Sequence, residues 1–297
     1  MSLSEQDLLA LIERIRPWKR GDKRAPHKPL LLLMALGRLQ RGEGRLVAFS
    51  EVEADLLRLL KKYGPSRQSY HPEYPFWRLQ NDRLWEVPGG DRLNTRRSNN
   101  DPPVTEMRKV AGGLPAPVFD LLRDRPDLVE RLAVAILDEH FEDSYEGRLL
   151  ADVGLRIDGY SWARRRKRDP RFRLMVLDAY EGRCAVCGLD ATLLDSPVAV
   201  EAAHVKSHKH HGPDRVDNGL CMCALHHEAF DLGVLGLTPD HRVLVSDWLK
   251  GGESVDEYFR RYQRERLRGP VVGAASVAAA HIEWHYLNVF KRDVRAA

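Results

Sequence analysis

The residues best suited to chemistry are four cysteines and several histidines that lie between positions 184 and 227. Cys184 and Cys187 form a Cys-x-x-Cys pair, and Cys223 with His226 repeats that spacing further along the chain. Two such pairs supply the four ligands of a tetrahedral structural zinc ion. Cys221 is either a buried thiol or an alternative ligand; we favour Cys223, because it pairs with His226 at the knuckle spacing.

Three further polar residues lie among the zinc ligands, although no zinc knuckle requires them. His204 follows an apolar, β-prone run and should lie near the end of a strand. Asn218 lies in a turn-like segment, and His227 comes directly after the last zinc ligand. An imidazole suits general base catalysis because its unperturbed pKa is close to neutrality. The pattern therefore indicates a catalytic group within a zinc-stabilised fold.

This His–Asn–His order, with a knuckle directly before the last histidine, resembles the HNH endonucleases of the ββα-metal class over roughly the last 130 residues. The resemblance implies that His204 is the general base that takes a proton from the water attacking a phosphodiester. It implies that Asn218 ties the loop to the strand and helps to orient His204. It also implies that His227 binds a single catalytic Mg²⁺ or Mn²⁺ ion, with Asp231, one helical turn later, as its partner.

The residue before the candidate base departs from this class. Many HNH enzymes carry an Asp or a His there as a metal ligand, whereas this chain has Ala203. Glu201 is the nearest carboxylate, but strand alternation places it on the opposite face from His204, so we do not expect it to be a ligand. Ala203 leaves one alternative open, a non-catalytic DNA-binding protein with a zinc-stabilised domain.

A rigid, basic segment between two prolines lies near the N-terminus, at Arg24–Pro29, and runs into the apolar stretch Leu30–Leu36. Pro29 is well placed as the first residue of a buried helix. The side chains of Arg24, His27 and Lys28 would then lie beside the N-terminus of this helix. A helix N-terminus attracts anions, so the segment predicts an anion site.

A second notable stretch covers residues 69–87 and is rich in aromatic and prolyl rings. We expect Phe76–Leu79 and Leu84–Val87 to form a hairpin around a turn at residues 81–82. The rings in the irregular loop before it belong to Tyr70, Pro72, Tyr74 and Pro75. They indicate either a small apolar hollow on the surface or a plug at the end of a small core.

The polar, basic stretch from Asp91 to Pro103 comes next. It is suited to a loop that enters a DNA groove and touches base edges, or to a solvated loop. Its candidate contact residues are Arg96, Arg97, Ser98 and Asn99.

Together these N-terminal stretches resemble the sulfur-binding domain of phosphorothioate-dependent HNH restriction endonucleases, over roughly residues 1–145. In that family a surface cavity of prolyl and tyrosyl rings receives the sulfur of a phosphorothioate linkage in DNA. Such a sulfur is larger and less strongly hydrated than the oxygen it replaces, so an apolar cavity can accept it. The residues that the resemblance assigns to DNA or sulfur binding are Arg24, Pro26, His27, Lys28, Tyr70, Tyr74, Pro75, Arg78, Arg96, Arg97, Ser98 and Asn99.

The length of 297 residues allows two domains, each with its own core. We expect an α+β protein with a mostly helical sulfur-binding domain over residues 1–145 and a basic linker over 146–168. A zinc-stabilised ββα-metal domain would follow over 169–297. The basic run Ala163–Arg168 would act as an arm that contacts phosphates.

Composition bears on the partners and the compartment. The formal net charge of +4 fits an anionic polymer without requiring one. Cysteines confined to the knuckles favour a reducing compartment, no signal peptide is visible, and the longest apolar run, Leu30–Leu36, is too short to span a membrane. We therefore expect a soluble, cytoplasmic protein that binds double-stranded DNA and no membrane.

The whole sequence predicts a modification-dependent DNA endonuclease, of the type IV restriction class, that recognises phosphorothioate DNA and cuts nearby. The expected metals are a structural Zn²⁺ and a catalytic Mg²⁺ or Mn²⁺. A nuclease that reads a methylated base is a competing prediction, which would need a pocket for a flipped base. A homodimer is an open alternative, because a double-strand cut by a chain with one active site requires two chains or two binding events.

Overall fold

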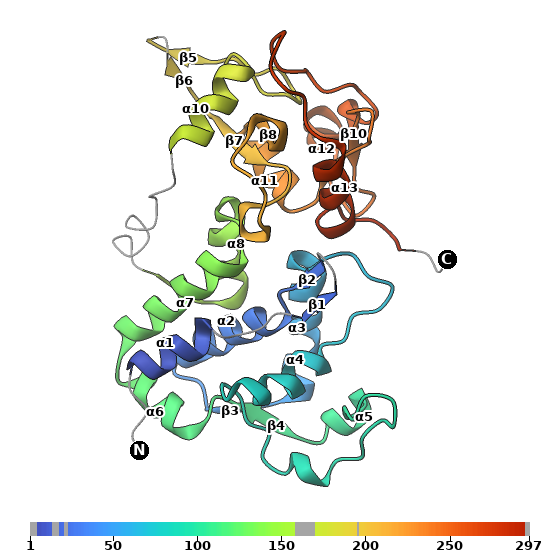
Figure 1. Ribbon diagram of the computed structural model, residues 1–297. Helices are drawn as coiled ribbons and strands as arrows, with labels where there is room; N and C mark the ends of the chain where they lie inside the picture. The colour runs from blue at the N-terminus through green and yellow to red at the C-terminus, as the bar shows by residue number, and fades with distance from the viewer. Residues whose placement is uncertain (1–4, 14–17, 21–22, 158–169, 195, 295–297) are drawn as a thin grey trace. The chain divides into compact units, whose positions relative to one another are not determined.

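The computed structural model describes residues 5–13, 18–20, 23–157, 170–194 and 196–294. The chain divides into two compact units, which we describe separately (Figure 1). The N-terminal unit comprises Met1–Gly64 and Ser69–Arg166, and the C-terminal unit comprises Pro65–Gln68 and Lys167–Ala297. Both units contain helices and short strands, so the predicted two-domain α+β architecture is confirmed.

The N-terminal unit is mostly helical. Its helices are α1 (Glu5–Glu13), α2 (His27–Gln40), α3 (Phe49–Tyr63), α4 (Glu73–Arg78), α5 (Val104–Met107), α6 (Ala116–Arg123), α7 (Pro126–His140) and α8 (Glu146–Val153), with 3₁₀ turns at Leu79–Asp82, Gly90–Arg92 and Asp143–Tyr145. Its strands form two short antiparallel pairs, β1 (Trp18–Arg20) with β2 (Lys23–Ala25), and β3 (Leu46–Ala48) with β4 (Ala111–Gly113).

Helix α2 is the centre of this unit. Every residue from Pro29 to Gly37 is buried, because the stretch is apolar and has neighbouring helices around it. Helices α3, α4, α6, α7 and α8 all contact α2 (Figure 1). The prediction of a buried helix here is confirmed, but the helix begins at His27, two residues before Pro29.

The predicted hairpin over residues 76–87 is wrong. Helix α4 and the 3₁₀ turn after it occupy the first half of this stretch. Phe76 and Leu79 lie one helical turn apart and are both buried, so a helix buries the same apolar residues that the expected strand would have buried. A proline is tolerated in the first turn of a helix, which accommodates Pro75. Tyr74 and Pro75 therefore lie on a helix and not in an irregular loop.

Helix α8 and the residues after it close the N-terminal unit. The Gln40 side chain binds the backbone N–H and C=O of Arg156, at 2.7 and 2.8 Å. Arg41 donates to the carbonyl oxygens of Val153 and Gly154, both at 2.9 Å. These contacts hold the chain against α2 up to residue 156. The basic run 163–168 lies outside the described residues, and the expected domain bounds stay a prediction.

The C-terminal unit combines short helices with hairpins. Its helices are α10 (Pro170–Ala179), α11 (Ala224–Asp231), α12 (Glu253–Tyr258) and α13 (Ala279–Asn288), with 3₁₀ turns at His208–His210, Val216–Asn218 and Arg260–Tyr262. Its antiparallel pairs are β5 (Thr192–Leu193) with β6 (Ser196–Pro197), β7 (Val200–His204) with β8 (Gly219–Cys223), and β9 (Leu235–Leu237) with β10 (Val243–Val245). Nowhere in the described parts of the chain is a helix long and apolar enough to cross a membrane.

The hairpin β7–β8 and helix α11 form the centre of this unit. The register pairs Val200 with Cys223 and His204 with Gly219. Strand β8 is buried along its whole length, and α11 begins directly after it. Helix α10 packs closely on the hairpin, since a Cβ at Gly219 would lie 2.4 Å from the Val176 side chain. The order of strand, strand and helix is the one that the HNH resemblance implied.

Candidate functional site

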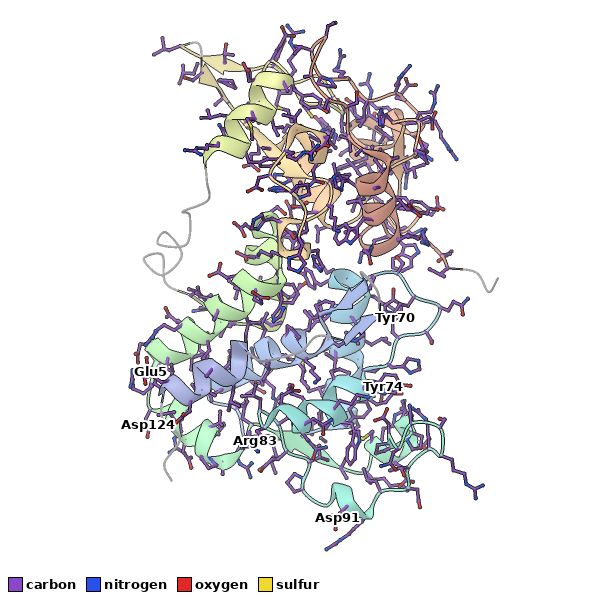
Figure 2. The ribbon with its side chains drawn as sticks, viewed as in Figure 1. Glu5, Tyr70, Tyr74, Arg83, Asp91 and Asp124 are labelled. Atoms are coloured by element: carbon purple, nitrogen blue, oxygen red, sulfur yellow. The ribbon has the colours of Figure 1, made fainter. Side chains whose placement is uncertain are left out.

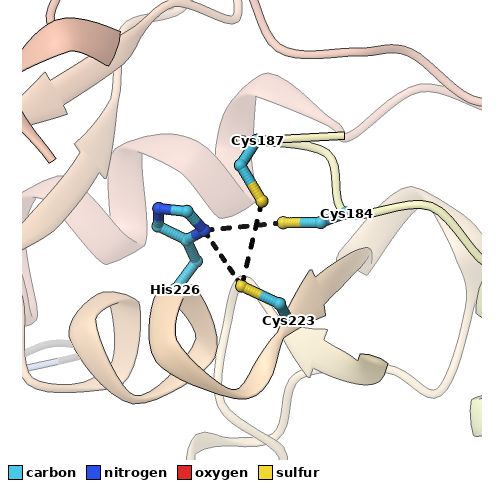
Figure 3. A group of neighbouring side chains, drawn as sticks. All are labelled: Cys184, Cys187, Cys223 and His226. Carbon is cyan, nitrogen blue, oxygen red and sulfur yellow. Dashed lines mark hydrogen bonds between the residues drawn. The ribbon is translucent and has the colours of Figure 1, made fainter. Parts of the chain in front are cut away.

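The Cys-x-x-Cys and Cys-x-x-His pairs converge on one point of the C-terminal unit (Figure 3). One ligand atom from each of Cys184, Cys187, Cys223 and His226 lies within 4.8 Å of the others. The Nδ1 atom of His226 lies 3.6 Å from the sulfur of Cys184 and 3.1 Å from that of Cys223. Its Nε2 donates to the carbonyl oxygen of Tyr258 at 2.9 Å, which leaves Nδ1 as the ligand atom. Three thiols and one imidazole form a donor set that fits zinc.

Cys221 does not belong to this group. It lies on β8 opposite Ala202 and is buried. Burial raises the pKa of its thiol to about 12, so it remains a neutral thiol at physiological pH. The structure places Cys223, and not Cys221, in the Cys/His cluster.

The candidate base, His204, lies at the end of β7, where its position after an apolar run predicted it. Its ring stacks on Phe172 of α10, with 3.8 Å between ring centroids. Its Nε2 atom lies 2.8 Å from Oδ1 of Asp214, and its side chain is only 12% exposed. A carboxylate at one imidazole nitrogen orients the ring and stabilises the imidazolium that forms when the ring takes a proton.

Asn218 holds the loop between β7 and β8 closed. Its side chain is fully buried, and its Oδ1 accepts from the backbone N–H of Lys206 at 2.7 Å. Its Nδ2 donates to the carbonyl oxygens of Lys206 and Pro213, at 2.9 and 3.0 Å. Lys206 follows His204 by two residues and Pro213 precedes Asp214. The amide therefore fixes the backbone on both sides of the His204–Asp214 contact.

His227 lies between two carboxylates. Its Nδ1 atom is 2.6 Å from Oε2 of Glu201, and its Nε2 is 3.3 Å from Oδ2 of Asp231, one turn later on α11. Burial lowers the pKa of His227, but Asp231 and Glu201 outweigh that effect and raise the pKa to about 10. The site thus attracts positive charge, whether from a proton or from a metal ion.

The contact of Glu201 with His227 is the feature that sequence reasoning missed. Strand alternation does place Glu201 on the opposite face of β7 from His204. The same alternation places it on the face of Ala203, two residues later, where other HNH enzymes carry their ligand. That face contacts α11, which carries His227. Comparing the strand face of Glu201 with that of Ala203, and not with that of His204, would have predicted this contact.

Two further predicted DNA-binding residues of the N-terminal unit, Arg78 and Arg96, contact Tyr74 of α4. Figure 2 labels Tyr74. The guanidinium of Arg78 lies 4.3 Å from the centre of the Tyr74 ring, and the His71 ring stacks on it with 4.5 Å between centroids. Arg96 approaches from the following loop and donates to the Tyr74 hydroxyl at 3.5 Å. Tyr74 is partly buried, and polar side chains surround its ring. Helix α4, which carries Tyr74, packs on α2.

Two buried carboxylates tie this cluster to the loop. Glu73 is 1% exposed, accepts from Arg96 at 3.2 Å and lies 3.1 Å from Nδ1 of His71. Asp101 is buried and accepts from Nε of Arg78 at 3.0 Å, and its Oδ2 also binds Nη2. Glu73 and Arg78 lie on α4, whereas Arg96 and Asp101 lie on the loop. The two ion pairs are therefore crossed: the acid is on the helix in one pair and on the loop in the other. They clamp the loop onto the helix.

The other predicted contact residues take several positions. Arg97, Ser98 and Asn99 are exposed at the tip of the clamped loop. Lys28 forms an ion pair with Asp82, and Pro75 is buried, which turns it away from solvent. Pro26, His27 and Tyr70 are partly buried, and Arg24 lies on β2 with its side chain outside the described atoms.

A family model of HNH endonucleases matches residues 184–238, so the C-terminal unit contains an HNH endonuclease domain, and its Cys/His cluster fits a zinc ion. The model of the ScoMcrA-like DNA sulfur-binding domain matches residues 5–158, and the chain belongs to that family. Both resemblances drawn from the sequence are thereby confirmed. No curated protein matches the chain.

Similar solved structures each cover about half of the chain. The sulfur binding domain of ScoMcrA complexed with phosphorothioated DNA is 27% identical, and the alignment covers 50% of this chain and 94% of that one, with a TM-score of 0.44. The sulfur binding and SRA domains of ScoMcrA, with the same kind of DNA, are 28% identical over 50% and 46%, with a TM-score of 0.45. The type IV phosphorothioation-dependent restriction endonuclease ScoMcrA is 26% identical over 50% and 27%, with a TM-score of 0.42. With TM-scores this low, the assignment rests on the family models.

Proposed function

We propose that the protein is a modification-dependent DNA endonuclease, which binds phosphorothioate DNA with its N-terminal unit and hydrolyses phosphodiester bonds with its C-terminal unit. The observation that carries this proposal is the presence of a DNA sulfur-binding domain and an HNH domain in one chain. The proposed bounds are 1–145 for the sulfur-binding domain, 146–168 for the linker and 169–297 for the nuclease. The enzyme would act in the cytoplasm on double-stranded DNA.

His204 is proposed as the general base. It would take a proton from the attacking water, and Asp214 would orient its ring and balance the positive charge that results. Phe172 restricts the ring from one face, which favours a single orientation. Asn218 acts through the backbone, because it holds the loop that carries Asp214. These contacts give Asp214, Phe172 and Asn218 separate tasks around the proton transfer to His204.

His227 and Glu201 are proposed to hold the catalytic Mg²⁺ or Mn²⁺, and Asp231, at the other ring nitrogen of His227, would orient the imidazole. An imidazole nitrogen and a carboxylate oxygen are donors that suit such an ion, and the Asp231 carboxylate adds negative charge to the site. When bound, the ion would stabilise the negative charge that develops on the phosphate and the leaving oxygen. Glu201 would replace the ligand that Ala203 cannot provide.

Tyr74 is proposed as the apolar surface that meets the sulfur, with Arg78 and Arg96 beside the same linkage. Each of these arginines is already balanced by a buried carboxylate, Asp101 or Glu73. An ordinary phosphate would therefore gain little from their charge while losing water at the ring. A phosphorothioate sulfur loses less hydration there, so the balance favours the modified linkage. The exposed loop tip at residues 97–99 would contact base edges.

Cleavage of matched duplexes, with one phosphorothioate or with none, tests the proposal directly. We expect the wild-type protein to cut only the modified duplex, to require Mg²⁺ or Mn²⁺, and to be inactive in EDTA. His204→Ala should abolish cutting while DNA affinity and zinc content stay near the wild-type values. His208→Ala is the matched control, because His208 lies on the same loop, close to Asp214, but is 68% exposed. It should retain most of the activity.

Three results would contradict the proposal in different ways. Equal cutting of both duplexes would show that the protein does not recognise phosphorothioate. Preferential cutting of a methylated duplex would show that it reads a flipped base instead. Retained cutting by His204→Ala would remove His204 from the mechanism. Sedimentation of the protein with a modified duplex would show whether two chains act together as a homodimer.

A further inference from the structure

The segment Tyr258–Arg268 carries a concentration of positive charge that neither proposed site uses. Residues 260–268 contain five arginines and one glutamate, a formal charge of +4 in nine residues, which equals the formal net charge of the whole chain. All five arginine side chains are exposed. The segment follows α12 (Figure 1) and belongs to the same unit as the Cys/His cluster.

The backbone of this segment is fixed along the edge of β10. The N–H of Arg264 donates to the carbonyl of Val243 at 2.8 Å, and the N–H of Val243 donates to the carbonyl of Glu265 at 2.9 Å. Leu267 donates to the carbonyl of His241 at 2.9 Å, and its side chain is buried in the core of the unit. Because side chains alternate along an extended segment, burial of Leu267 turns its two neighbours outward. These neighbours are Arg266 and Arg268. Arg264 lies in the turn before them, with a φ of 67°, and its side chain is exposed as well.

The Cys/His cluster anchors both ends of the segment. At the first end, Nε2 of His226 donates to the carbonyl oxygen of Tyr258, and the rings of Phe259 and Tyr262 meet the His226 ring edge-on, at 5.8 and 5.6 Å between centroids. At the other end, the N–H of Arg268 donates to the carbonyl of Ala185, the residue after Cys184, at 2.9 Å. His226 and the backbone next to Cys184 therefore hold the segment in place.

The charges of this segment are largely unbalanced. Arg260 pairs with Asp256. Within the described residues, no carboxylate lies at ion-pair distance from Arg261, Arg264, Arg266 or Arg268. Exposed guanidinium groups on a fixed backbone can replace the counterions of a polyanion without first breaking internal ion pairs. These four arginines are therefore available to bind phosphate groups.

We propose that Arg264, Arg266 and Arg268 form a contact surface for the DNA backbone, which the zinc cluster holds in position for the nuclease unit. Phosphates carry no sequence information, so this surface would add affinity without specificity and leave recognition to the N-terminal unit. The inference rests on the proposed function only for the choice of DNA as the polyanion.

Salt-dependent binding of an unmodified duplex by the full-length, zinc-loaded protein tests this surface. The variant Arg264→Gln/Arg266→Gln/Arg268→Gln should bind more weakly, and its plot of log K against log salt should be flatter by about 2 to 3 units, roughly one for each phosphate that is no longer neutralised. Neither cleavage nor phosphorothioate recognition enters this measurement. The surface can therefore fail while the proposed function stands, and the converse also holds.

Two control variants remove the simpler explanations. Lys61→Gln/Arg123→Gln/Arg131→Gln removes the same charge from exposed positions of the N-terminal unit and should leave the slope unchanged. Glu265→Gln changes the charge of the same segment in the opposite direction and should not weaken binding. Zinc content must match wild type in every variant. A triple variant with wild-type affinity and slope would overturn the proposal, and so would an equal loss in the Lys61 control.

Discussion

The N-terminal and C-terminal units hold their arginines in opposite ways. In the cluster around Tyr74, Arg78 and Arg96 each face a buried carboxylate on the other side of the clamp. In the segment after α12, Arg264 and Arg266 project from a fixed backbone with no described carboxylate at ion-pair distance. Balanced arginines can shape a surface without attracting every phosphate, whereas unbalanced ones attract any phosphate. The difference suits one unit to selecting a linkage and the other to holding the polymer.

The two units are also stabilised by different means. The N-terminal unit has a continuous apolar helix, α2, with helices around it. The C-terminal unit has short strands and short helices, and its Cys/His cluster joins the loop after α10, the end of β8 and helix α11. A metal that joins separate elements supplies folding free energy which the short elements cannot supply themselves.

The largest expected effect is the loss of stability of the C-terminal unit when its metal is removed. Cys184→Ser should release zinc and unfold the C-terminal unit, because a structural zinc site contributes several kcal/mol, on the order of 10 in isolated knuckles. The N-terminal unit should stay folded and still bind phosphorothioate DNA. Zinc content and hydrogen exchange, measured separately for the two units, check this. The matched control is Cys221→Ser, a thiol outside the cluster, which should keep its zinc. A metal-free but fully protected C-terminal unit would contradict the structural role of zinc.

The second prediction concerns the crossed ion pairs of the N-terminal unit. Asp101→Asn removes the charge that balances Arg78 and should destabilise this unit by about 2 kcal/mol, less than for a fully buried pair because Arg78 is one-third exposed. Because Arg78 is then unbalanced, ordinary DNA should bind more tightly and with a steeper salt dependence. Urea unfolding and paired binding curves measure the two effects. Asp82→Asn, which unbalances Lys28 instead, is the comparison variant.

The sequence predicted the C-terminal site more completely than the N-terminal one, and the reason is the spacing of the residues. Cys184 with Cys187, and Cys223 with His226, are local pairs whose spacing alone indicates a metal. The clamp joins Glu73 to Arg96 and Arg78 to Asp101 across twenty-three residues, a separation that carries no periodic signal. The hairpin expected over residues 76–87 failed for a related cause. A short apolar run fits a strand or a helix equally well, and packing of α4 on α2 decided between them.

The third prediction concerns how the stability of the C-terminal unit depends on pH. Burial lowers the pKa of His285 on α13 to about 4. Its Nε2 donates to the carbonyl oxygen of Phe230, and its ring stacks on the Phe230 ring. In the unfolded chain the ordinary pKa is near 6.5. Between pH 6.5 and pH 4 the unfolded state therefore binds more protons, so the free energy of unfolding falls as pH falls through this window. From pH 7 to pH 5 the loss should be about 2 kcal/mol.

The variant His285→Gln isolates this effect from every other titrating group. Glutamine can still donate to the Phe230 carbonyl but does not titrate, so its stability should fall less steeply between pH 7 and pH 5 than that of wild type. Comparing both proteins by denaturant unfolding at pH 8, 7, 6 and 5 gives the slope difference. Contributions from the zinc ligands and from carboxylates cancel in that difference. Parallel curves would show that His285 is not held neutral in the folded unit.

The smallest expected effect is the sharpest test of how the N-terminal unit selects its linkage. Tyr74 meets Arg78 and His71 through the faces of its ring. Arg96 lies over the same ring, 5.8 Å from its centre, and donates to its hydroxyl at a long 3.5 Å. If the ring itself receives the sulfur, Tyr74→Phe should keep the preference for phosphorothioate DNA, and Tyr74→Ala should reduce it by about tenfold, or 1.4 kcal/mol. Affinities for modified and unmodified duplexes, measured over a salt series, give that ratio. Arg78→Ala should instead change the binding of both duplexes together, because its charge acts on any phosphate. If Tyr74→Ala weakened both equally, the ring would be a general contact, and balanced arginines alone could not account for selection of the mark.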